Sequence, residues 1–344
     1  MIVFYVSGHG FGHASRDVEL INAIIARRPD IRIAVRTSAP PWLFAMTEKP
    51  VEVQPLEADT GLVQIDSLRF DERGSILRAA EFYASFAERA DAEAAVLREI
   101  GAELVVGDIP PLAFAAARRA GLPSIAIGNF TWDWIYEAYD AFEALAPGVI
   151  PIIRAAYATA TRALRLPFHG GFEPMASVTM DVPLIARRSH RDPAETRRLL
   201  GIRDDRPVVL ASFGAYGAPL PWDAVRADHR FSVISFEREP PQGLKYQDLV
   251  AAADVVISKP GYGIVSECVA NGTALLYTSR GRFIEYDLFV AEMPRVLRCR
   301  LISQEDLLAG AWADAIAALL AQPAPPELGR VDGAQVAAGE ILKD

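Results

Sequence analysis

The sequence SGHGFGHASR, residues 7–16, lies between two segments with different hydrophobic patterns. Residues 2–6 are all hydrophobic, which predicts a buried strand, and residues 15–26 carry apolar side chains at helical spacing. A strand, a glycine-rich turn and a helix N-terminus direct free backbone N–H groups and the positive end of the helix dipole toward one point. The stretch therefore predicts a Rossmann-like unit that binds a polar or anionic ligand at this turn.

The glycines of this stretch depart from the dinucleotide-binding fingerprint. That fingerprint is G-x-G-x-x-G, followed about 20 residues later by an acid for the ribose. Here His13 stands at the third glycine position, and the next predicted strand, residues 31–35, is followed by Arg36 and Thr37. Arg36 leaves binding of the 2′-phosphate of NADP as one alternative. A second alternative is a tight turn that only packs two histidines, His9 and His13.

Composition limits the classes of function. A length of 344 residues suggests two domains, and a hydrophobic share of 51% is enough to form their cores. The net charge of −9 argues against a nucleic-acid partner. Two cysteines give neither a disulfide framework nor a zinc pattern and fit a reducing compartment. Because the sequence has no apolar run of about 18 residues and no signal-like start, we expect a cytoplasmic protein without a transmembrane segment.

Predicted strands and helices alternate along both halves of the chain, with long helices at residues 75–100, 150–163 and 304–321. Such alternation is typical of parallel sheets covered by helices on both faces, so the predicted fold class is α/β. The alternation is interrupted near residue 180 and then restarts. We therefore expect two tandem Rossmann-like domains that face each other across a cleft, with the following bounds: residues 1–180, residues 181–322, and a tail at 323–344 that packs back on the first domain.

Polar residues follow the predicted strands of the first half. Asp108 ends one strand, and Asn129 follows the next, a few residues before Trp132 and Asp133. Because ligands bind beyond the carboxyl ends of parallel strands, we expect these residues to line one ligand site together with the first glycine-rich turn. The aromatic face of Trp132 suits sugar stacking. The alternatives are a core position for Trp132 and a structural helix-capping carboxylate for Asp108.

The stretch ISKPGYGIVSE, residues 257–267, is the most specific pattern of the second half. A predicted strand ends at Ser258, glycines follow it, and a helix begins near Ile264, a geometry that suits a diphosphate. Lys259 lies beside the turn, with further basic residues after the next strand at Arg280 and Arg282. Glu267 lies about one turn into the helix. Its carboxylate either accepts the hydroxyls of a ribose or only complements the helix dipole.

This half resembles the nucleotide-sugar-binding domain of glycosyltransferases with the two-Rossmann-domain GT-B fold, and especially the N-acetylglucosaminyltransferase that makes lipid II. The resemblance implies that Glu267 binds the donor ribose and that residues 212–217 form a second loop near the diphosphate. It also implies a contact between the donor sugar and Glu285, where the family usually has Gln or Asn. The residues assigned to the donor are Ser212, Gly214, Gly217, Ser258, Lys259, Gly261, Tyr262, Gly263, Ser266, Glu267 and Glu285.

The whole chain resembles the glycosyltransferase-like N-terminal region of L-arabinokinases and its stand-alone bacterial relatives. The matching segments, in chain order, are SGHGFGHASR, RTSAP from residue 36, GDIPPLA from 107, NFTWDWIY from 129, DVPLIARR from 181 and KPGYGIVSE from 259. The matching region runs from residue 2 to residue 290 or so. The sequence has no counterpart of the kinase half, so we expect no sugar kinase activity from it.

A glycosyl transfer needs a base that takes the proton of the acceptor hydroxyl. We favour His13, because relatives have a glycine-preceded histidine in this loop and because a helix N-terminus favours the neutral form of a histidine. His9 and Asp108 are the other candidates, and Asp108 has the alternative role of orienting His13. The residues assigned to the acceptor and the sugar are Gly10, Phe11, Gly12, Arg16, Asn129, Trp132 and Asp133.

The predicted function is transfer of a hexosyl or N-acetylhexosaminyl group from a nucleotide-sugar donor, with UDP as the favoured nucleotide, to an acceptor that the sequence does not identify. The first domain would hold the base and the acceptor, and the second would hold the donor. We expect an inverting, metal-independent reaction without a cofactor, because no D-x-D pair stands at a strand end and no histidine cluster has ligand spacing. The alternatives are a nucleotide-sugar hydrolase or epimerase of the same fold, and a non-catalytic nucleotide- or sugar-binding module.

Overall fold

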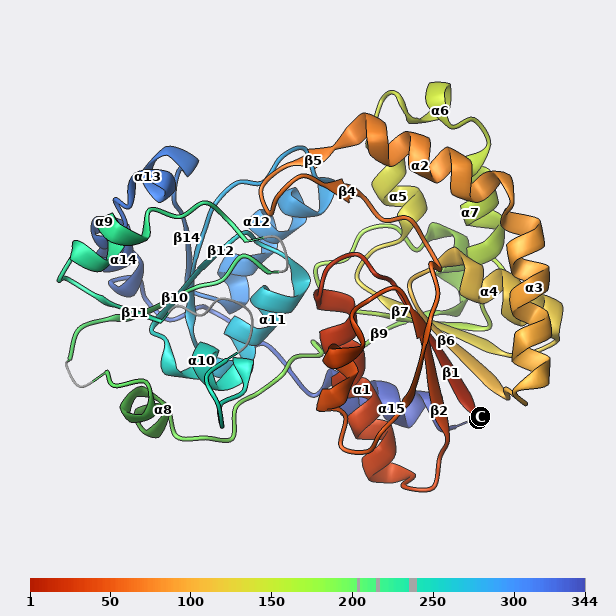
Figure 1. Cartoon of the computed structure of the whole chain (residues 1–344), viewed down its shortest axis with the longest axis horizontal. Helices are drawn as coiled ribbons and strands as arrows, with labels where there is room; N and C mark the ends of the chain where they lie inside the picture. Colours follow the sequence, from red (N-terminus) through yellow and green to blue (C-terminus); the bar gives the residue numbers. More distant parts are fainter. Residues whose placement is uncertain (203–204, 215–216, 235–239, 344) are drawn as a thin grey trace. The chain divides into compact units, whose positions relative to one another are not determined.

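The structure is a computed structural model that describes residues 1–202, 205–214, 217–234 and 240–343. The chain divides into two compact units, each assembled from segments that are distant in sequence (Figure 1). Unit 1 consists of Met1–Gln64, Phe70–Ile185 and Asp332–Asp344, and unit 2 consists of Ile65–Arg69 and Ala186–Val331. The first domain thus extends to Ile185, a few residues beyond the expected boundary. Residues 323–331 lie in unit 2 and only the last part of the tail lies in unit 1.

Unit 1 is built on a seven-stranded parallel sheet in the order β3-β2-β1-β6-β7-β8-β9. The central strands β1, β6 and β7 are buried at every position, as expected for a parallel sheet covered on both faces. From β1 the sheet is extended on one side by β2 and β3 and on the other side by β6 and the later strands, so the strand order reverses between β1 and β6. The loops that follow β1 and β6 are therefore neighbours at the carboxyl edge of the sheet, where ligands bind in such folds. The strands are β1 (Ile2–Val6), β2 (Ile33–Thr37), β3 (Glu52–Pro55), β6 (Leu104–Asp108), β7 (Ser124–Gly128), β8 (Arg162–Arg165) and β9 (Thr179–Asp181).

Helices cover both faces of the unit 1 sheet. Helix α1 (Gly12–Arg27) packs against the C-terminal helix α15 (Gly333–Ile341), and α3 (Phe86–Glu99) packs against α4 (Pro111–Ala120). Figure 1 shows the first pair on one side of the sheet and the second pair on the other. The remaining helical segments are η1 (Pro41–Met46), α2 (Glu72–Ala84), α5 (Trp132–Glu137), α6 (Phe142–Leu145), α7 (Val149–Tyr157) and η2 (Glu173–Val178).

Unit 2 is built on a five-stranded parallel sheet in the order β11-β10-β12-β13-β14. Its chain order reverses between β10 and β12, which makes the loops after these strands neighbours. The strands are β10 (Val208–Ala211), β11 (Ser232–Ile234), β12 (Val255–Ser258), β13 (Ala274–Tyr277) and β14 (Cys299–Leu301). The helices are α8 (Pro193–Leu199), α9 (Trp222–Ala227), α10 (Tyr246–Ala252), α11 (Tyr262–Asn271), α12 (Ile284–Val296), α13 (Gln304–Ala309) and α14 (Ala313–Leu320).

Three predicted helices are shorter than expected. The helix predicted at residues 75–100 is two helices, α2 and α3, which meet at Ser85. The helix predicted at 304–321 is also two, because Gly310 adopts a φ of 77° and ends α13 with a left-handed cap. The helix predicted at 150–163 ends at Tyr157, and strand β8 follows it. Across the described residues, no helix is both long enough and apolar enough to cross a bilayer.

Candidate functional site

His13 and Asp108 form a close pair at the carboxyl edge of the unit 1 sheet. His13 is the second residue of α1, and Asp108 is the last residue of β6, the strand beside β1. The Nδ1 atom of His13 lies 2.8 Å from Oδ1 of Asp108, and both side chains are buried. Of the three roles considered for Asp108, namely base, orienting residue and helix cap, this contact supports the one in which Asp108 orients His13.

Arg16 holds the Asp108 carboxylate through both of its oxygens. Its Nε donates to Oδ2 over 2.5 Å, its Nη2 donates to Oδ1, and its Nη1 donates to Oδ1 of Asn129 over 2.8 Å. Burial by itself raises the pKa of Asp108, but the charges and hydrogen bonds of Arg16 and His13 outweigh burial and hold that pKa well below its ordinary value. Asp108 is therefore an ionised hydrogen-bond acceptor. Arg16 binds this carboxylate and Asn129 accepts from Arg16, and the predicted contacts of both residues with the acceptor stay predictions.

The ionised Asp108 determines which nitrogen of His13 can accept a proton. A carboxylate only accepts hydrogen bonds, so Nδ1 carries the hydrogen that points to Asp108 and the lone pair remains on Nε2. Nη2 of Arg16 also lies 3.0 Å from Nδ1, but an unprotonated Nδ1 would place its lone pair against the carboxylate. The rings of His13 and Phe130 form a T-shaped pair with centroids 5.6 Å apart. This arrangement leaves Nε2 as the proton-accepting atom.

Asp59 is a buried acid that the sequence analysis did not identify. The Ser7 hydroxyl donates to its Oδ1 over 3.1 Å, and the Trp132 indole N–H donates to its Oδ2 over 2.9 Å. Burial raises the pKa of Asp59 to about 6, against the lowering effect of the hydrogen bonds and of His13. Asp59 lies in an irregular stretch without periodicity, so no sequence signal could have found it. Only the fold brings it beside the first glycine-rich turn.

Asp17 is a second buried acid missing from the sequence-based set. It is fully buried on α1, and as an ionised acceptor it would have no hydrogen-bond partner among the residues the structure describes. Burial raises the pKa of Asp17 well above its ordinary value, the charge of Asp108 raises it further, and Arg16 opposes the shift. The fold therefore favours the protonated form of Asp17. The proton lets Asp17 donate to Asp108 and keeps a second negative charge away from it.

An Asp17→Asn variant should gain stability relative to the wild type as the pH rises. Because the pKa of Asp17 in the folded state lies above the ordinary value of 3.8, its proton stabilises the wild type fully only below that value. Between pH 3.8 and the folded-state pKa, the free energy of unfolding of the wild type falls by up to about 1.4 kcal/mol per pH unit. The asparagine variant has no proton to lose at this position, so its stability does not change for this reason. Denaturant unfolding from about pH 4 upward measures the difference.

The control for this experiment is the exposed acid Asp30, whose side chain is 81% exposed. An Asp30→Asn variant should differ from the wild type by an amount that changes little with pH, because the Asp30 side chain stays in solvent when the protein folds. A pH-independent difference for Asp17→Asn would show that Asp17 is not held protonated by the fold.

His9, the second candidate base, is engaged through both ring nitrogens. Its Nδ1 accepts from the backbone N–H of Leu62 over 3.3 Å, and its Nε2 lies 3.4 Å from the Gln64 amide. Its ring meets Trp132 edge-on, with centroids 5.5 Å apart, and Gly61 approaches so closely that a Cβ there would lie 2.8 Å from Nδ1. His9 therefore holds the 61–64 segment beside the turn, and the geometry favours His13 over His9 as the base.

Two residues that were assigned to sugar binding are part of the core, which corrects the prediction. Trp132 is fully buried, stacks on Tyr136 and donates to Asp59, so neither face of its indole is open to a sugar. Asp133 is 1% exposed and accepts from Nε of Arg154 over 3.0 Å. The physical reason is that Trp132 and Asp133 are the first two residues of α5, and this helix packs with both side chains toward the interior of unit 1.

The open part of the turn is formed by Gly10, Phe11 and Gly12. Gly10 has a φ of 78°, a conformation that favours glycine, and a Cβ at Gly10 or Gly12 would have no atom within 4 Å. Phe11 precedes the first helical residue of α1 and meets Trp42 edge-on, with centroids 5.4 Å apart. Trp42 is 47% exposed. No atom crowds the two glycine positions, and the assignment of these three residues to the acceptor stays a prediction.

In unit 2, Ser212 and Ser258 link the loops after β10 and β12. The Ser258 hydroxyl donates to the backbone carbonyl of Ser212 over 2.5 Å, and the backbone N–H of Ser212 donates to the carbonyl of Ile257 over 2.9 Å. The Ser212 hydroxyl lies 2.7 Å from the Tyr246 hydroxyl. These bonds hold the loops after β10 and β12 together at the point where the chain order reverses.

Lys259 and Arg280 bring positive charge to the glycine turn that precedes α11. A Cβ at Gly261 would lie 4.0 Å from Nη1 of Arg280, whose guanidinium stacks over the Phe283 ring at 4.1 Å. Burial lowers the pKa of Lys259 to about 7, and the charge of Arg280 lowers it further, against the effects of Glu285 and Asp66. Two basic side chains and the N-terminus of α11 therefore meet at one turn, which is a suitable environment for a diphosphate.

Glu267, the predicted ribose ligand, is paired with Arg187. Nε of Arg187 donates to Oε1 of Glu267 over 2.6 Å, and the guanidinium also lies 4.9 Å from the centre of the Tyr246 ring. Burial raises the pKa of Glu267, and Arg187 opposes the shift. The carbonyl of Arg187 accepts from the Asn271 amide over 3.1 Å. A ribose at Glu267 would have to share the carboxylate with Arg187, which the sequence analysis did not assign to the site.

The other residues assigned to the donor lie around the same two loops. Gly214 and Gly217 have φ values of 69° and 61°, but residues 215–216 between them lie outside the described part of the chain. Tyr262 and Ser266 are buried in the first turns of α11, where the Ser266 hydroxyl donates to the carbonyl of Gly263 over 3.0 Å. Glu285 is buried near the start of α12. Their contacts with a donor stay predictions.

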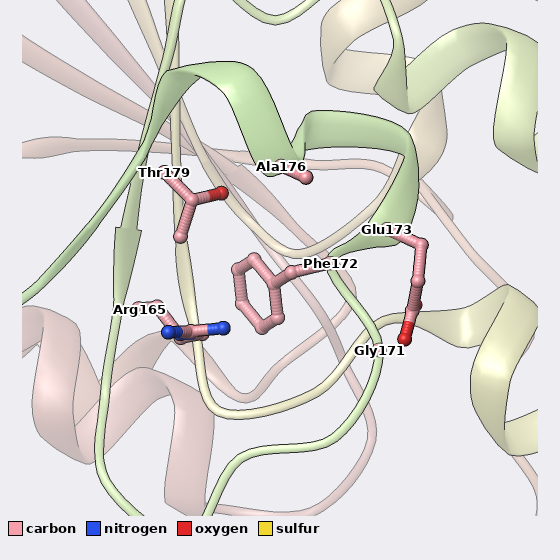
Figure 2. Close-up of a pocket in the computed structure, with 6 residues that line it drawn as sticks. All are labelled: Arg165, Gly171, Phe172, Glu173, Ala176 and Thr179. Carbon is pink, nitrogen blue, oxygen red and sulfur yellow. The ribbon is translucent and has the colours of Figure 1, made fainter.

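A separate cavity of about 190 Å³ opens in unit 1 beside β8, η2 and β9 (Figure 2). Figure 2 shows the Phe172 ring between the side chains of Arg165 and Glu173. Arg165 donates to Oδ1 of Asp181 over 2.7 Å. The cavity is lined by Arg165, Gly171, Phe172, Glu173, Ala176 and Thr179, none of which belongs to the cluster around His13.

Comparison with curated proteins gives one clear relationship over the whole chain. The chain is 31% identical to L-arabinokinase of Arabidopsis thaliana over 368 aligned residues that cover 100% of this chain. It spans about one third, 34%, of that protein. No protein-family model matches the chain. The resemblance to L-arabinokinases that the motifs predicted is confirmed.

Comparison with solved structures identifies the fold. The glycotransferase of kitacinnamycin superposes with a TM-score of 0.62 at 19% identity and covers 99% of this chain and 98% of its own. MurG of Acinetobacter baumannii gives a TM-score of 0.55 at 13% identity, with coverages of 100% and 99%. The glycosyltransferase VinC in complex with dTDP gives 0.57 at 14% identity, with coverages of 99% and 94%. The chain therefore has the GT-B fold, and the predicted fold class is confirmed.

Proposed function

We propose that this protein transfers a sugar from a nucleotide-sugar donor to a hydroxyl group of an acceptor, with His13 as the general base. The observation that carries the proposal is the His13–Asp108 pair, in which an ionised Asp108 accepts from Nδ1 and leaves Nε2 to accept a proton. The acceptor oxygen forms a bond to the anomeric carbon while the bond from that carbon to the diphosphate breaks. The acceptor proton passes to Nε2, and Asp108 stabilises the imidazolium that forms.

Unit 2 supplies the charge that the departing diphosphate needs in this proposal. Lys259, Arg280 and the N-terminus of α11 meet at the turn of Gly261 and would stabilise the negative charge that develops on the leaving group. UDP is the favoured nucleotide because of the resemblance to the lipid II enzyme, and dTDP is the second candidate because VinC binds it. A hexosyl or N-acetylhexosaminyl group is the proposed cargo.

Nucleotide binding and donor consumption test the proposal. UDP or dTDP should raise the melting temperature, and a UDP- or dTDP-sugar should be consumed only when a suitable acceptor is present. Rapid consumption without an acceptor would identify a hydrolase, because the same pair can activate water. Binding without consumption in any acceptor mixture would identify a non-catalytic module. If no nucleoside diphosphate binds at all, the transferase, the hydrolase and the non-catalytic binding module would all be contradicted.

Binding of UDP should weaken above neutral pH because Lys259 loses its proton. The pKa of Lys259 is about 7 in the free protein, so above that pH the binding of the negatively charged diphosphate must be accompanied by uptake of a proton on Lys259. Linkage then predicts that the Kd for UDP increases by up to about tenfold per pH unit above that value. Isothermal titration from about pH 7 to pH 9 measures the change, in a range where the phosphate of the nucleotide is already ionised, since its second pKa is about 6.

A Lys259→Arg variant is the matched control, because arginine stays charged across this range. Its Kd for UDP should change by less than about twofold over the same pH interval. Equal pH dependence in the two proteins would show that another group is responsible and would remove Lys259 from the diphosphate site.

A further inference from the structure

The segment Ile65–Arg69 comes from the first half of the sequence but belongs to unit 2. It is the tip of a hairpin formed by β4 (Val63–Gln64) and β5 (Phe70–Asp71). Oδ1 of Asp66 accepts from the backbone N–H groups of Leu68 and Arg69 over 2.8 and 2.9 Å. These bonds give the tip a defined turn conformation, so it is more than a loose connection.

Ser67 and Leu68 contact two loops of unit 2. The Ser67 hydroxyl donates to the backbone carbonyl of Phe213, in the loop after β10, and Ser67 is only 2% exposed. The carbonyl of Leu68 accepts from the backbone N–H of Gly281 over 3.0 Å, in the loop after β13. The Leu68 side chain is 6% exposed and packs in the core cluster that contains Phe213 and Ile257.

The two loops that the tip contacts lie on either side of the Lys259 turn. Strands β10, β12 and β13 are adjacent in the sheet, so the loops that follow them reach the same edge. The charge of Asp66 also raises the pKa of Lys259, so the tip acts electrostatically on that turn. Without the tip, the carbonyl of Phe213 and the N–H of Gly281 would lose these partners, and the core beside Phe213 would lose the Leu68 side chain.

We infer that the Ile65–Arg69 segment positions the donor-binding loops of unit 2, so that nucleotide affinity depends on Ser67 and Leu68 although neither has to touch the nucleotide. The inference rests on the proposed function for its ligand, a nucleoside diphosphate. Its structural part, the ordering of the loops after β10 and β13, can be measured without any ligand. Ser67 and Leu68 are positioning residues in this account.

Leu68→Ala and Ser67→Ala should each accelerate amide hydrogen exchange in the loops after β10 and β13. The Kd for UDP should increase by about tenfold in Leu68→Ala and by a smaller factor in Ser67→Ala. The full-length protein is used, with exchange measured first without ligand and then with UDP or dTDP as the probe. Ile65→Ala is the matched control in the same segment, because Ile65 is 60% exposed. Its exchange rates and Kd should equal those of the wild type.

The outcomes separate this inference from the proposed function. Wild-type exchange rates and a wild-type Kd in both variants would overturn the inference. Faster exchange throughout unit 2, including the β12 strand, would also overturn it, because Leu68 would then support the whole core and not these loops. If the loops alone exchange faster but the wild type binds no nucleotide, the positioning role holds and the proposed function fails.

Discussion

Replacing His13 by glutamine should lower the turnover of a nucleotide sugar by about 10³-fold, the usual contribution of a positioned general base. The Kd for the nucleoside diphosphate should stay within about twofold, because the residues proposed to bind the diphosphate belong to unit 2 and His13 belongs to unit 1. Glutamine keeps a hydrogen-bonding side chain toward Asp108 but has no nitrogen that accepts a proton. Turnover is measured with the UDP- or dTDP-sugar that the wild type consumes fastest.

The exposed His190 provides the control for this experiment. A His190→Gln variant should keep wild-type turnover and wild-type nucleotide affinity, because that histidine has no place in either candidate site. Retention of more than a tenth of the wild-type rate by His13→Gln would remove His13 as the base. Asp59 would then be the next residue to substitute, because it is buried beside the same turn and has a pKa of about 6.

Replacing Arg16 by methionine should lower the free energy of unfolding by about 3–5 kcal/mol, the usual cost of leaving a buried charge without its partner. Arg16 contacts both oxygens of Asp108, and it also donates to Asn129. Asp108 is 0% exposed, so no solvent can replace the guanidinium. Methionine fills a similar volume, which limits the loss to charge and hydrogen bonding. Urea denaturation at neutral pH measures the change.

The matched control is Arg165→Met, which removes an arginine from an exposed ion pair. Arg165 donates to Asp181, whose side chain is 68% exposed, so the loss should be within about 1 kcal/mol. Equal losses for the two variants would contradict the view that burial makes the Arg16 pair costly to break. An Arg16→Met, Asp108→Asn double variant should be less destabilised than Arg16→Met alone, because the uncompensated charge is gone.

Much of the fold follows from local sequence. Residues 2–6 form a buried strand because five consecutive hydrophobic residues fit the interior of a parallel sheet, and the alternation of such runs with helices predicted both sheets. The breaks at Ser85 and Gly310 were missed because helical periodicity continues across them. Strand β8 was missed because only its two central residues are hydrophobic and buried, and an arginine stands on each side of them. Local patterns are weakest where tertiary contacts decide where a helix ends.

By itself the sequence determined the fold class, the glycine-rich turns at residues 7–16 and 257–267, and the choice of His13 as the candidate base. The reason is that strand, turn and helix signals are local, and a histidine at the start of a helix can be recognised from the sequence. The tertiary structure decided how the groups around His13 are hydrogen-bonded, and it added Asp17 and Asp59 to the residues expected there. Asp108, Arg16, Asp17 and Asp59 come from three different stretches of the chain. Only the tertiary structure shows that Trp132 is buried, that Glu267 pairs with Arg187 and that residues 65–69 belong to unit 2. The physical reason is that hydrogen bonds and burial depend on which residues the topology brings together, and separation along the chain does not contain that information.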